Sequence, residues 1–256
     1  MDDSFTIGKI AQLLDIPAAT IRYWEEQGLF SVKKGHNRYR RYDLGDLIRV
    51  ADVVSLRNLG IPIKQVTQFQ ACTLDQYQQS LLELEHKLND KLAAYQRRLR
   101  RTLRQKQCAG EVLRLQTQEF QPEEVPFQAV AAFDYREQDK LLQYCGDPTV
   151  YVRYFDSRDL STETRCIILP PDSGEGPLWT RPEGGAFLTF LIRELVHHDY
   201  RSDVEEKLAV VQRRYRTGKL LAQYLLTAME GGELTDYLKA YVEVWPLDSP
   251  GMEDAL

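Results

Sequence analysis

The sequence predicts an α+β protein with several domains, and three observations support this fold class. Residues 1–71 contain short segments whose apolar residues recur at helical spacing, and residues 74–115 carry regularly spaced leucines without a proline. After residue 119, strand-like segments rich in β-branched and aromatic residues alternate with helical ones. A chain of 256 residues with 43% hydrophobic residues can form more than one core. We therefore expect three domains, over residues 1–71, 72–118 and 119–256.

The first two helices are predicted by the segment FTIGKIAQLLDIPAATIRYWEEQGLF at residues 5–30. Thr6 is a suitable N-cap for the first helix, and Asp15 is a residue type that tolerates the left-handed backbone of a turn. The second helix is expected to turn Ile21 and Trp24 inward. Two short helices joined by so short a turn form a helix-turn-helix, a motif whose second helix enters the major groove in DNA-binding proteins.

A two-stranded wing is predicted directly after the second helix. The segment KKGHNRYRRY at residues 33–42 holds five cations and no acid, and its end alternates aromatic and basic residues. Cations on a wing beside such a helix are placed to contact phosphates that flank a groove. Two more helices are expected after the wing, with Asp43 as the cap of the first and Pro62 at the start of the second.

The charge of the chain is distributed unevenly. Residues 1–71 hold ten Lys and Arg against eight Asp and Glu, residues 72–120 hold nine against six, and residues 121–256 hold fourteen against twenty-four. This asymmetry indicates a front that faces nucleic acid and an acidic C-terminal part that stays away from phosphate. Charge alone fits equally well a solvated surface that keeps the protein soluble.

Four segments occur in a specific order: Thr-Ile-Gly at 6–8, TIRYWEEQGL at 20–29, NRYRRY at 37–42 and LRNLGIPIKQV at 56–66. In this order they resemble the winged-helix DNA-binding domain of the MerR family of transcription regulators. Two positions depart from the family pattern, since Trp24 replaces a tyrosine and Arg38 replaces a glycine of the wing. The resemblance implies that DNA is contacted by Thr20, Arg22, Tyr23, Arg40 and Tyr42. Arg38 is a further candidate, because it adds a cation to the predicted wing. A packing role, for instance for Tyr42 beneath the wing, is the alternative for each of them.

A single long helix is predicted over residues 74–115. Its apolar residues step by three and four positions and form a heptad seam of Leu74, Tyr77, Leu81, Leu84, Leu88, Leu92, Tyr95, Leu99 and Leu103. Such a helix is roughly 60 Å long and needs a partner helix in water, most simply its own copy in a homodimer. The resemblance implies an antiparallel coiled coil. We interpret the basic segment RRLRR at 97–101 as a solvated or salt-bridged face rather than as a second DNA site.

A polar linker with two prolines is expected at residues 116–126, before a domain of mixed strands and helices. The order strand-helix-strand-strand occurs twice in this domain. The repetition predicts one sheet built from two similar halves, with helices on one face and a cleft where the halves meet. This order, together with the final segment AYVEVWPL at 240–247, is similar to the GyrI-like effector-binding domain of BmrR-like multidrug regulators.

A ligand site is predicted around the last strand. Tyr241, Glu243 and Trp245 share one face of this strand, whereas Val242 and Val244 face the other way and suit a core covered by helices. Aromatic walls with one acid are typical of sites for lipophilic cations, and the resemblance implies this role for Glu243. Further candidates for the walls are Tyr151, Phe155, Trp179 and Tyr224. The alternatives are a structural salt bridge between Glu243 and an arginine of the domain, and ordinary core positions for the aromatic residues.

Neither a metal nor another cofactor is expected. The cysteines Cys72, Cys108, Cys145 and Cys166 are scattered without metal-ligand spacing. The one concentrated His/Asp patch, HHDY at 197–200, comes without a known catalytic fingerprint. No apolar run is long enough to span a membrane, and the acidic start of the chain disfavours secretion, so we expect a cytoplasmic location.

These observations predict a homodimeric, ligand-responsive transcription regulator rather than an enzyme. Its expected partners are the double-stranded DNA of a promoter operator, a small-molecule effector and RNA polymerase. The resemblance implies activation by distortion of a promoter whose elements are badly spaced for the polymerase. The alternative is a C-terminal domain that works as a small-molecule hydrolase or as a protein-interaction module, neither of which needs a DNA-binding head.

Overall fold

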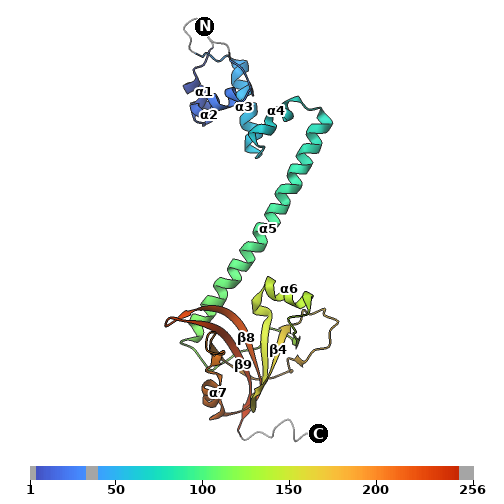
Figure 1. Cartoon of the computed structure of the whole chain (residues 1–256), viewed down its shortest axis with the longest axis vertical. Helices are drawn as coiled ribbons and strands as arrows, with labels where there is room; N and C mark the ends of the chain where they lie inside the picture. Colours follow the sequence, from blue (N-terminus) through green and yellow to red (C-terminus); the bar gives the residue numbers. More distant parts are fainter. Residues whose placement is uncertain (1–3, 33–39, 248–256) are drawn as a thin grey trace. The chain divides into compact units, whose positions relative to one another are not determined.

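A computed structural model of the chain describes residues 4–32 and 40–247. The chain forms two compact units, Met1–Ala93 and Ala94–Leu256. One long helix, α5 (Leu74–Leu115), runs through the boundary between them (Figure 1). None of the described helices is both long enough and apolar enough to cross a membrane.

The N-terminal unit begins with two short helices, α1 (Ile7–Leu14) and α2 (Ala18–Glu26). The side chain of Thr6 accepts a hydrogen bond from the backbone N–H of Lys9 at 3.2 Å and caps α1, as predicted. Asp15 ends α1 with a φ of 53°, which confirms the left-handed turn residue. The helix-turn-helix predicted from the sequence is therefore formed.

Two further helices, α3 (Leu44–Asn58) and α4 (Ile63–Ala71), complete the fold of this unit. Asp43 caps α3 in a reciprocal capping box with Asp46, and Pro62 directly precedes α4. The core is formed by buried apolar side chains from all these segments: Ile10, Ile21, Trp24, Leu29, Phe30, Tyr42, Val50, Val53, Leu56, Ile61 and Val66. Trp24 belongs to this core, as expected from its inward position.

Helix α5 takes part in the cores of both units. Tyr77 and Leu84 pack against the N-terminal core, and Cys108 and Val112 are buried in a cluster of the C-terminal unit. Between these ends large apolar side chains are exposed, with exposed fractions from 49% to 63% for Leu88, Leu92, Tyr95, Leu99 and Leu103. The helix begins and ends at the predicted residues, and the middle of its apolar seam has no partner within the chain.

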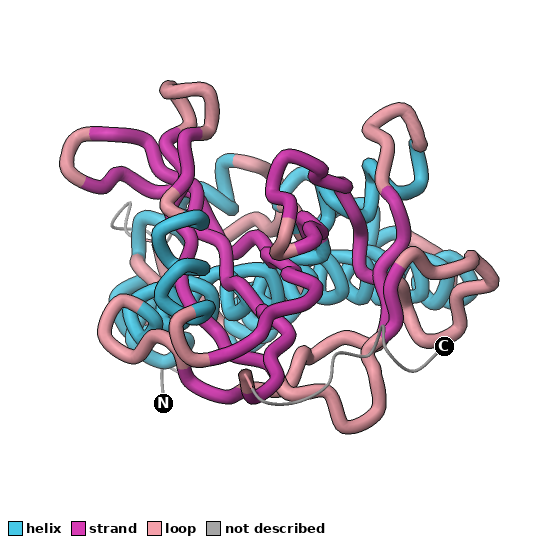
Figure 2. The backbone as a smooth tube through the Cα atoms, turned by 90° about the horizontal axis from the view of Figure 1, so that it is seen from below, coloured by secondary structure: helices cyan, strands magenta, loops and turns pink. Residues whose placement is uncertain are grey.

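The described part of the C-terminal unit contains one antiparallel sheet of nine strands (Figure 2). The longer strands are β2 (Ala129–Ala132), β3 (Tyr151–Asp156), β4 (Asp159–Ile168), β6 (Phe187–Leu195), β8 (Tyr215–Glu230) and β9 (Glu233–Pro246). The short strands are β1 (Gln121–Pro122), β5 (Trp179–Thr180) and β7 (Arg201–Ser202). The strand order is β1-β6-β9-β8-β3-β4-β2-β5, and β7 pairs with β6.

Helices lie after the first strand of each group of three long strands. Helix α6 (Gln138–Gly146) follows β2, and α7 (Val204–Gln212) follows β6 and the short β7. A turn of 3-10 helix, η1 (Pro148–Val150), precedes β3. Strand β3 pairs with β8, so the β2-β4-β3 group and the β8-β9-β6 group join at the centre of the sheet.

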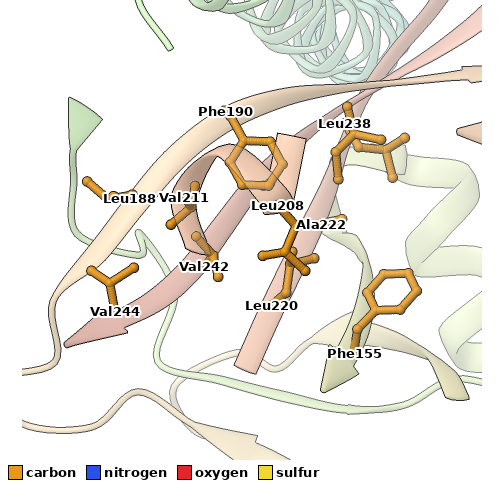
Figure 3. Close-up of a cluster of buried hydrophobic side chains, with 12 residues drawn as sticks. Phe155, Leu188, Phe190, Leu208, Val211, Leu220, Ala222, Leu238, Val242 and Val244 are labelled. Carbon is orange, nitrogen blue, oxygen red and sulfur yellow. The ribbon is translucent and has the colours of Figure 1, made fainter. Parts of the chain in front are cut away.

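The two faces of the sheet carry different cores. On the first, the α7 face, Val242 and Val244 of β9 pack with Phe190 of β6 and with Leu208 and Val211 of α7 (Figure 3). The prediction that these two valines face a helix-covered core is confirmed. On the second, the α5 face, two clusters contain Tyr241, Phe187, Leu221, Val125, Phe127 and Trp179, and farther along Leu191, Leu225 and Tyr237 with the end of α5.

The segment predicted as a linker, residues 116–126, is packed into the C-terminal unit. Val125 is fully buried, and β1 within this segment pairs with β6. Glu119 accepts a hydrogen bond from the Lys207 ammonium at 2.6 Å. The polar residues suggested a linker, but two of them, Glu119 and Glu123, pair with partners on α7 and the sheet. Helix α7 occupies Val204–Gln212, between β7 and β8.

Candidate functional site

Helix α2 presents three of the predicted DNA contacts. Arg22 and Tyr23 are exposed and Thr20 is half-buried, whereas Ile21 and Trp24 turn into the core. The helix is thus anchored by its apolar side and exposes the guanidinium of Arg22 and the hydroxyl group of Tyr23, whereas Thr20 lies one turn before Trp24, at the edge of the buried side. Groups of these kinds hydrogen-bond to phosphate oxygens and to base edges.

An ion pair holds Arg40 against α2. The Nε atom of Arg40 lies 2.8 Å from Oε2 of Glu25 and donates a hydrogen bond to Oε1 at 3.2 Å. The side chain of Arg40 is 38% exposed, and that of Glu25 is 16% exposed. Burial raises the pKa of the nearby Tyr42 hydroxyl, Glu25 adds to this effect, and Arg40 and Arg22 oppose it. Three charges that belong to α2 and the end of the wing therefore surround one hydroxyl group.

Tyr42 itself is a core residue, which is the packing role that the sequence left open as the alternative to a DNA contact. It is fully buried, and its backbone pairs with that of Phe5 through hydrogen bonds of 2.7 and 3.0 Å. The pattern of alternating aromatic and basic residues could not show that this tyrosine fills the core under α2. Among the residues that the structure describes, none is a hydrogen-bond partner of its hydroxyl group. Arg38 lies outside the described residues.

Two of the predicted ligand residues, Tyr241 and Trp179, are buried on the α5 face. The ring of Trp179 lies 6.1 Å from Phe127 and 6.4 Å from Phe187, measured between centroids. The Tyr241 ring lies 5.0 Å from the Lys239 ammonium, and burial raises the pKa of the Tyr241 hydroxyl to about 12. Both aromatic side chains pack in the core, which is the alternative that the sequence left open.

Glu243 and Trp245 pack against the backbone of Gly218. A Cβ atom on Gly218 would lie 2.6 Å from Oε2 of Glu243 and 2.5 Å from Cη2 of Trp245. The Glu243 carboxylate accepts a hydrogen bond from the backbone N–H of Lys219 at 3.3 Å, and burial raises its pKa. Because Gly218 lies where the register of β8 and β9 shifts, these two side chains cover an irregular point of the hairpin.

The remaining predicted wall residues, Tyr151, Phe155 and Tyr224, lie on the α7 face. Phe155 is buried in its core, and the Tyr224 hydroxyl is 2.7 Å from Oγ1 of Thr227. The Tyr151 ring lies 6.0 Å from that of Tyr144 on α6. The structure therefore places these three aromatic residues on the opposite face of the sheet from Glu243, and the predicted site is not assembled as one group.

The α7 face also carries a group of charges that no sequence pattern had indicated, the Arg153 cluster, formed by the half-buried Arg153 and Glu163 and the buried Glu194. The guanidinium of Arg153 donates to Glu163 at 2.8 and 2.6 Å and also donates to Glu194. Burial raises the pKa of the Glu194 carboxyl to about 7, although Arg153 opposes this shift. The guanidinium lies 5.8 Å from the ring of Phe155. A charge at an inward position of YVRYF was the signal that could have revealed the cluster.

A second group of charges joins α5 to the sheet. The Lys239 ammonium on β9 donates to Glu111 of α5 at 2.6 Å and also to Glu123, and Arg114 of α5 donates to both carboxylates. These hydrogen bonds to Arg114, with those to Lys239, lower the pKa of Glu111 to about 2. The last turns of α5 are therefore fixed to the C-terminal unit by paired charges as well as by apolar packing.

The other residues considered for chemistry are dispersed. Cys108 and Cys166 are buried, Cys72 is half-buried and Cys145 is exposed. In the described ranges, no three His, Cys, Asp or Glu side chains gather as a metal ion would require. His198 lies in the turn after β6, with Nε2 at 3.3 Å from Glu233.

Comparisons with known proteins concern mainly the N-terminal unit. Residues 5–71 match the model of the MerR HTH family regulatory proteins. Over 65 residues the chain is 32% identical to the HTH-type transcriptional regulator HmrR of Rhizobium leguminosarum bv. viciae, which is 25% of this chain and 50% of that protein. The chain thus spans half the length of this relative.

Two solved structures are also similar. The MerR family regulator HiNmlR, which lacks the sensor domain and is bound to promoter DNA, shares 23% identity over 43% of this chain and 90% of its own, with a TM-score of 0.35. A MerR family regulator from Bacillus cereus shares 15% identity over 56% of this chain and 96% of its own, with a TM-score of 0.36. The sequence match agrees with the structure of α1 and α2, of which α1 is capped by Thr6 and α2 turns Trp24 into the core. Residues 5–71 form a helix-turn-helix domain that is similar to the MerR HTH family regulatory proteins.

Proposed function

We propose that the protein is a transcription regulator that binds double-stranded DNA through its N-terminal unit. The observation that carries this proposal is the match of residues 5–71 to the MerR family, on a domain whose α2 turns Arg22 and Tyr23 to solvent. Arg40, paired with Glu25 of the same helix, adds a second guanidinium there. Two guanidinium groups and a tyrosine hydroxyl provide donors for phosphates and base edges.

Binding to a duplex selected from a random pool by the full-length protein tests this function. We expect the affinity to fall steeply with salt, because phosphate contacts release counterions. Arg22→Ala should weaken binding by on the order of tenfold, whereas Arg165→Ala, which removes the same charge from an exposed position on β4, should not. Failure to select any duplex, or equal effects of the two variants, would contradict the proposal.

A homodimer through α5 supports this function, because paired heads can read two half-sites of an operator. The exposed apolar seam from Leu88 to Leu103 offers the contact. Residues 75–90 hold four acids and one lysine, whereas residues 91–106 hold seven cations and no acid. An antiparallel pair would place the acidic half of each helix beside the basic half of the other, and a parallel pair would oppose like charges. RNA polymerase is the further partner of a regulator that acts by promoter distortion.

The C-terminal unit is proposed to sense a lipophilic cation. Its strand order, two groups of three long strands with a helix after the first strand of each, supports the duplicated GyrI-like arrangement. The structure favours a different acid from Glu243. Glu194 is buried on the α7 face, which also carries Tyr151 and Tyr224. Arg153 pairs with both Glu163 and Glu194 there, and Arg165 lies 3.9 Å from Glu163. The attraction for a lipophilic cation therefore rests on the Glu194 carboxylate and the aromatic rings of this face, and not on an excess of acids.

Titration with benzyltrimethylammonium and with its uncharged isostere neopentylbenzene, followed by tryptophan fluorescence, tests the sensing role. Glu194→Gln is expected to weaken the cation about tenfold, roughly 1.4 kcal/mol, and to leave the neutral probe unchanged. Glu243→Gln is the matched control and should change neither. A loss confined to Glu243→Gln would place the site on the α5 face, and a loss in neither variant would contradict cation sensing by these acids.

A further inference from the structure

Residues 40–42, the described end of the predicted wing, make two contacts with the body of the N-terminal unit. The first is Tyr42, whose side chain fills the core and whose backbone pairs with Phe5. The second is Arg40, two residues earlier and hence on the same side of an extended segment. Its side chain therefore runs toward α2 and meets Glu25 there.

The contact between Arg40 and Glu25 uses one edge of the guanidinium. Both recorded approaches, 2.8 and 3.2 Å, involve Nε. A guanidinium has five N–H donors in a fixed plane, and one of the Nη N–H bonds lies parallel to Nε–H. A carboxylate bound at this edge therefore leaves the other three Nη N–H groups directed away from it. A group held in this way can bridge two anions, whereas the ammonium of a lysine has no such planar fork.

Apart from its pairing with Arg40, the acid Glu25 does not suit a helix that binds DNA. Its carboxylate is an anion on the helix that the proposed function brings against phosphates, where repulsion would weaken binding. The neighbouring Glu26 is exposed and has no recorded partner among the described residues, whereas Glu25 is mostly buried and its Oε2 atom is inaccessible to solvent. A largely buried Glu25 that is paired with Arg40 is therefore suited to hold this arginine in place.

We propose that Glu25 is a positioning residue that holds Arg40 beside Arg22, so that Arg40 binds a DNA phosphate through its Nη groups while Nε stays on Glu25. The pair keeps the arginine in one rotamer before DNA arrives, which lowers the entropy lost on binding. The ion pair also neutralises the Glu25 carboxylate, which would otherwise repel the phosphate backbone of DNA. This inference rests on the proposed DNA-binding function and adds to it a residue that does not itself touch DNA.

The test compares Glu25→Gln with Glu26→Gln in the full-length protein, on the duplex that wild type selects from a random pool. Both variants remove one negative charge from α2, so simple electrostatics predicts tighter binding for both. If Glu25 positions Arg40, Glu25→Gln should bind on the order of fivefold more weakly than Glu26→Gln. Its log-log salt slope should also drop by about one unit, as in Arg40→Ala, because one phosphate contact is lost.

The double variant Glu25→Gln/Arg40→Ala should bind no more weakly than Arg40→Ala alone, because both changes remove the same contact. Arg40→Lys provides a second route if Glu25→Gln fails to fold, and it should lower the salt slope in the same way. Equal affinity and equal slopes for Glu25→Gln and Glu26→Gln would overturn the positioning role. Failure of wild type to select a duplex would instead overturn the DNA-binding function itself.

Discussion

Tyr42 shows at the scale of one residue how a functional pattern can have a structural cause. Its place in a row of basic and aromatic residues predicted a contact with DNA, yet its side chain is fully buried. A tyrosine in a core normally hydrogen-bonds its hydroxyl group, and this one has no such partner among the described residues. The hydroxyl is therefore expected to contribute little to stability.

Tyr42→Phe tests this interpretation. Removing an unsatisfied buried hydroxyl should leave the free energy of unfolding of the N-terminal unit unchanged or raise it by up to about 1 kcal/mol. The affinity for duplex DNA should also stay the same, since the ring keeps its place. Thermal unfolding and a DNA titration measure the two effects. A clear loss of affinity would indicate that the Tyr42 hydroxyl group contacts DNA.

Glu194 gives a second prediction at this scale, through the pH dependence of stability. Burial raises its pKa from 4.5 to about 7 in the folded state. The folded protein therefore binds a proton at Glu194 more tightly than the unfolded chain does. Protonation of Glu194 stabilises the fold, and this contribution is fully present below about pH 4.5. It should be lost as the pH rises from 4.5 through 7. Glu194→Gln should flatten this slope in melting curves followed by tryptophan fluorescence, and an unchanged slope would assign the pH dependence to other groups.

At the scale of elements, the helices of the N-terminal unit were the most predictable part of the fold. Thr6, Asp15 and Asp43 act on the backbone within a few residues of themselves, so their roles as caps and turn residue follow from local sequence. Alternation along β9 also predicted that Val242 faces a helix-covered core. Such periodicity assigns residues to two faces but does not show which other strands contribute to each face.

The proposed ligand site was less predictable because it depends on pairing between distant strands. Arg153 and Glu194 are 41 positions apart, and they meet only because β3 pairs with β8 and β6 with β9 in one sheet. A sequence pattern within either strand carries no information on this register. The polar segment 116–126 was misjudged for a similar reason, since its partners lie on β6 and α7.

The hairpin of β8 and β9 yields a prediction at the element scale. A Cβ on Gly218 would approach Trp245 and Glu243 to 2.5 and 2.6 Å, closer than side-chain atoms tolerate. Gly218→Ala should therefore lower the free energy of unfolding of the C-terminal unit by roughly 1–3 kcal/mol. Gly110→Ala on α5 is the matched control, because its Cβ would meet no atom within 4 Å and alanine favours a helix. Equal melting temperatures for the two variants would contradict the close packing at Gly218.

At the scale of the whole molecule, α5 is the element that both units share. Its apolar seam predicts a dimer, and its charge distribution predicts the antiparallel orientation. Leu88→Lys should produce monomers in light scattering, because it places a charge in the seam. Leu82→Lys is the control, since Leu82 is equally exposed, at 52% against 51%, but lies off the seam. A dimer that survives Leu88→Lys would place the interface elsewhere.

The long exposed middle of α5 also has a consequence for proteolysis. Trypsin cuts after lysine and arginine, and residues 91–106 offer seven such positions in a stretch that no core of the chain covers. A helix is cut only when it opens locally, and a helix without a packed partner opens often. Digestion should therefore divide the chain within this stretch when the protein is dilute and slow down as its concentration rises and copies pair. The cleavage rate thus reports how much of the chain is paired, without any label.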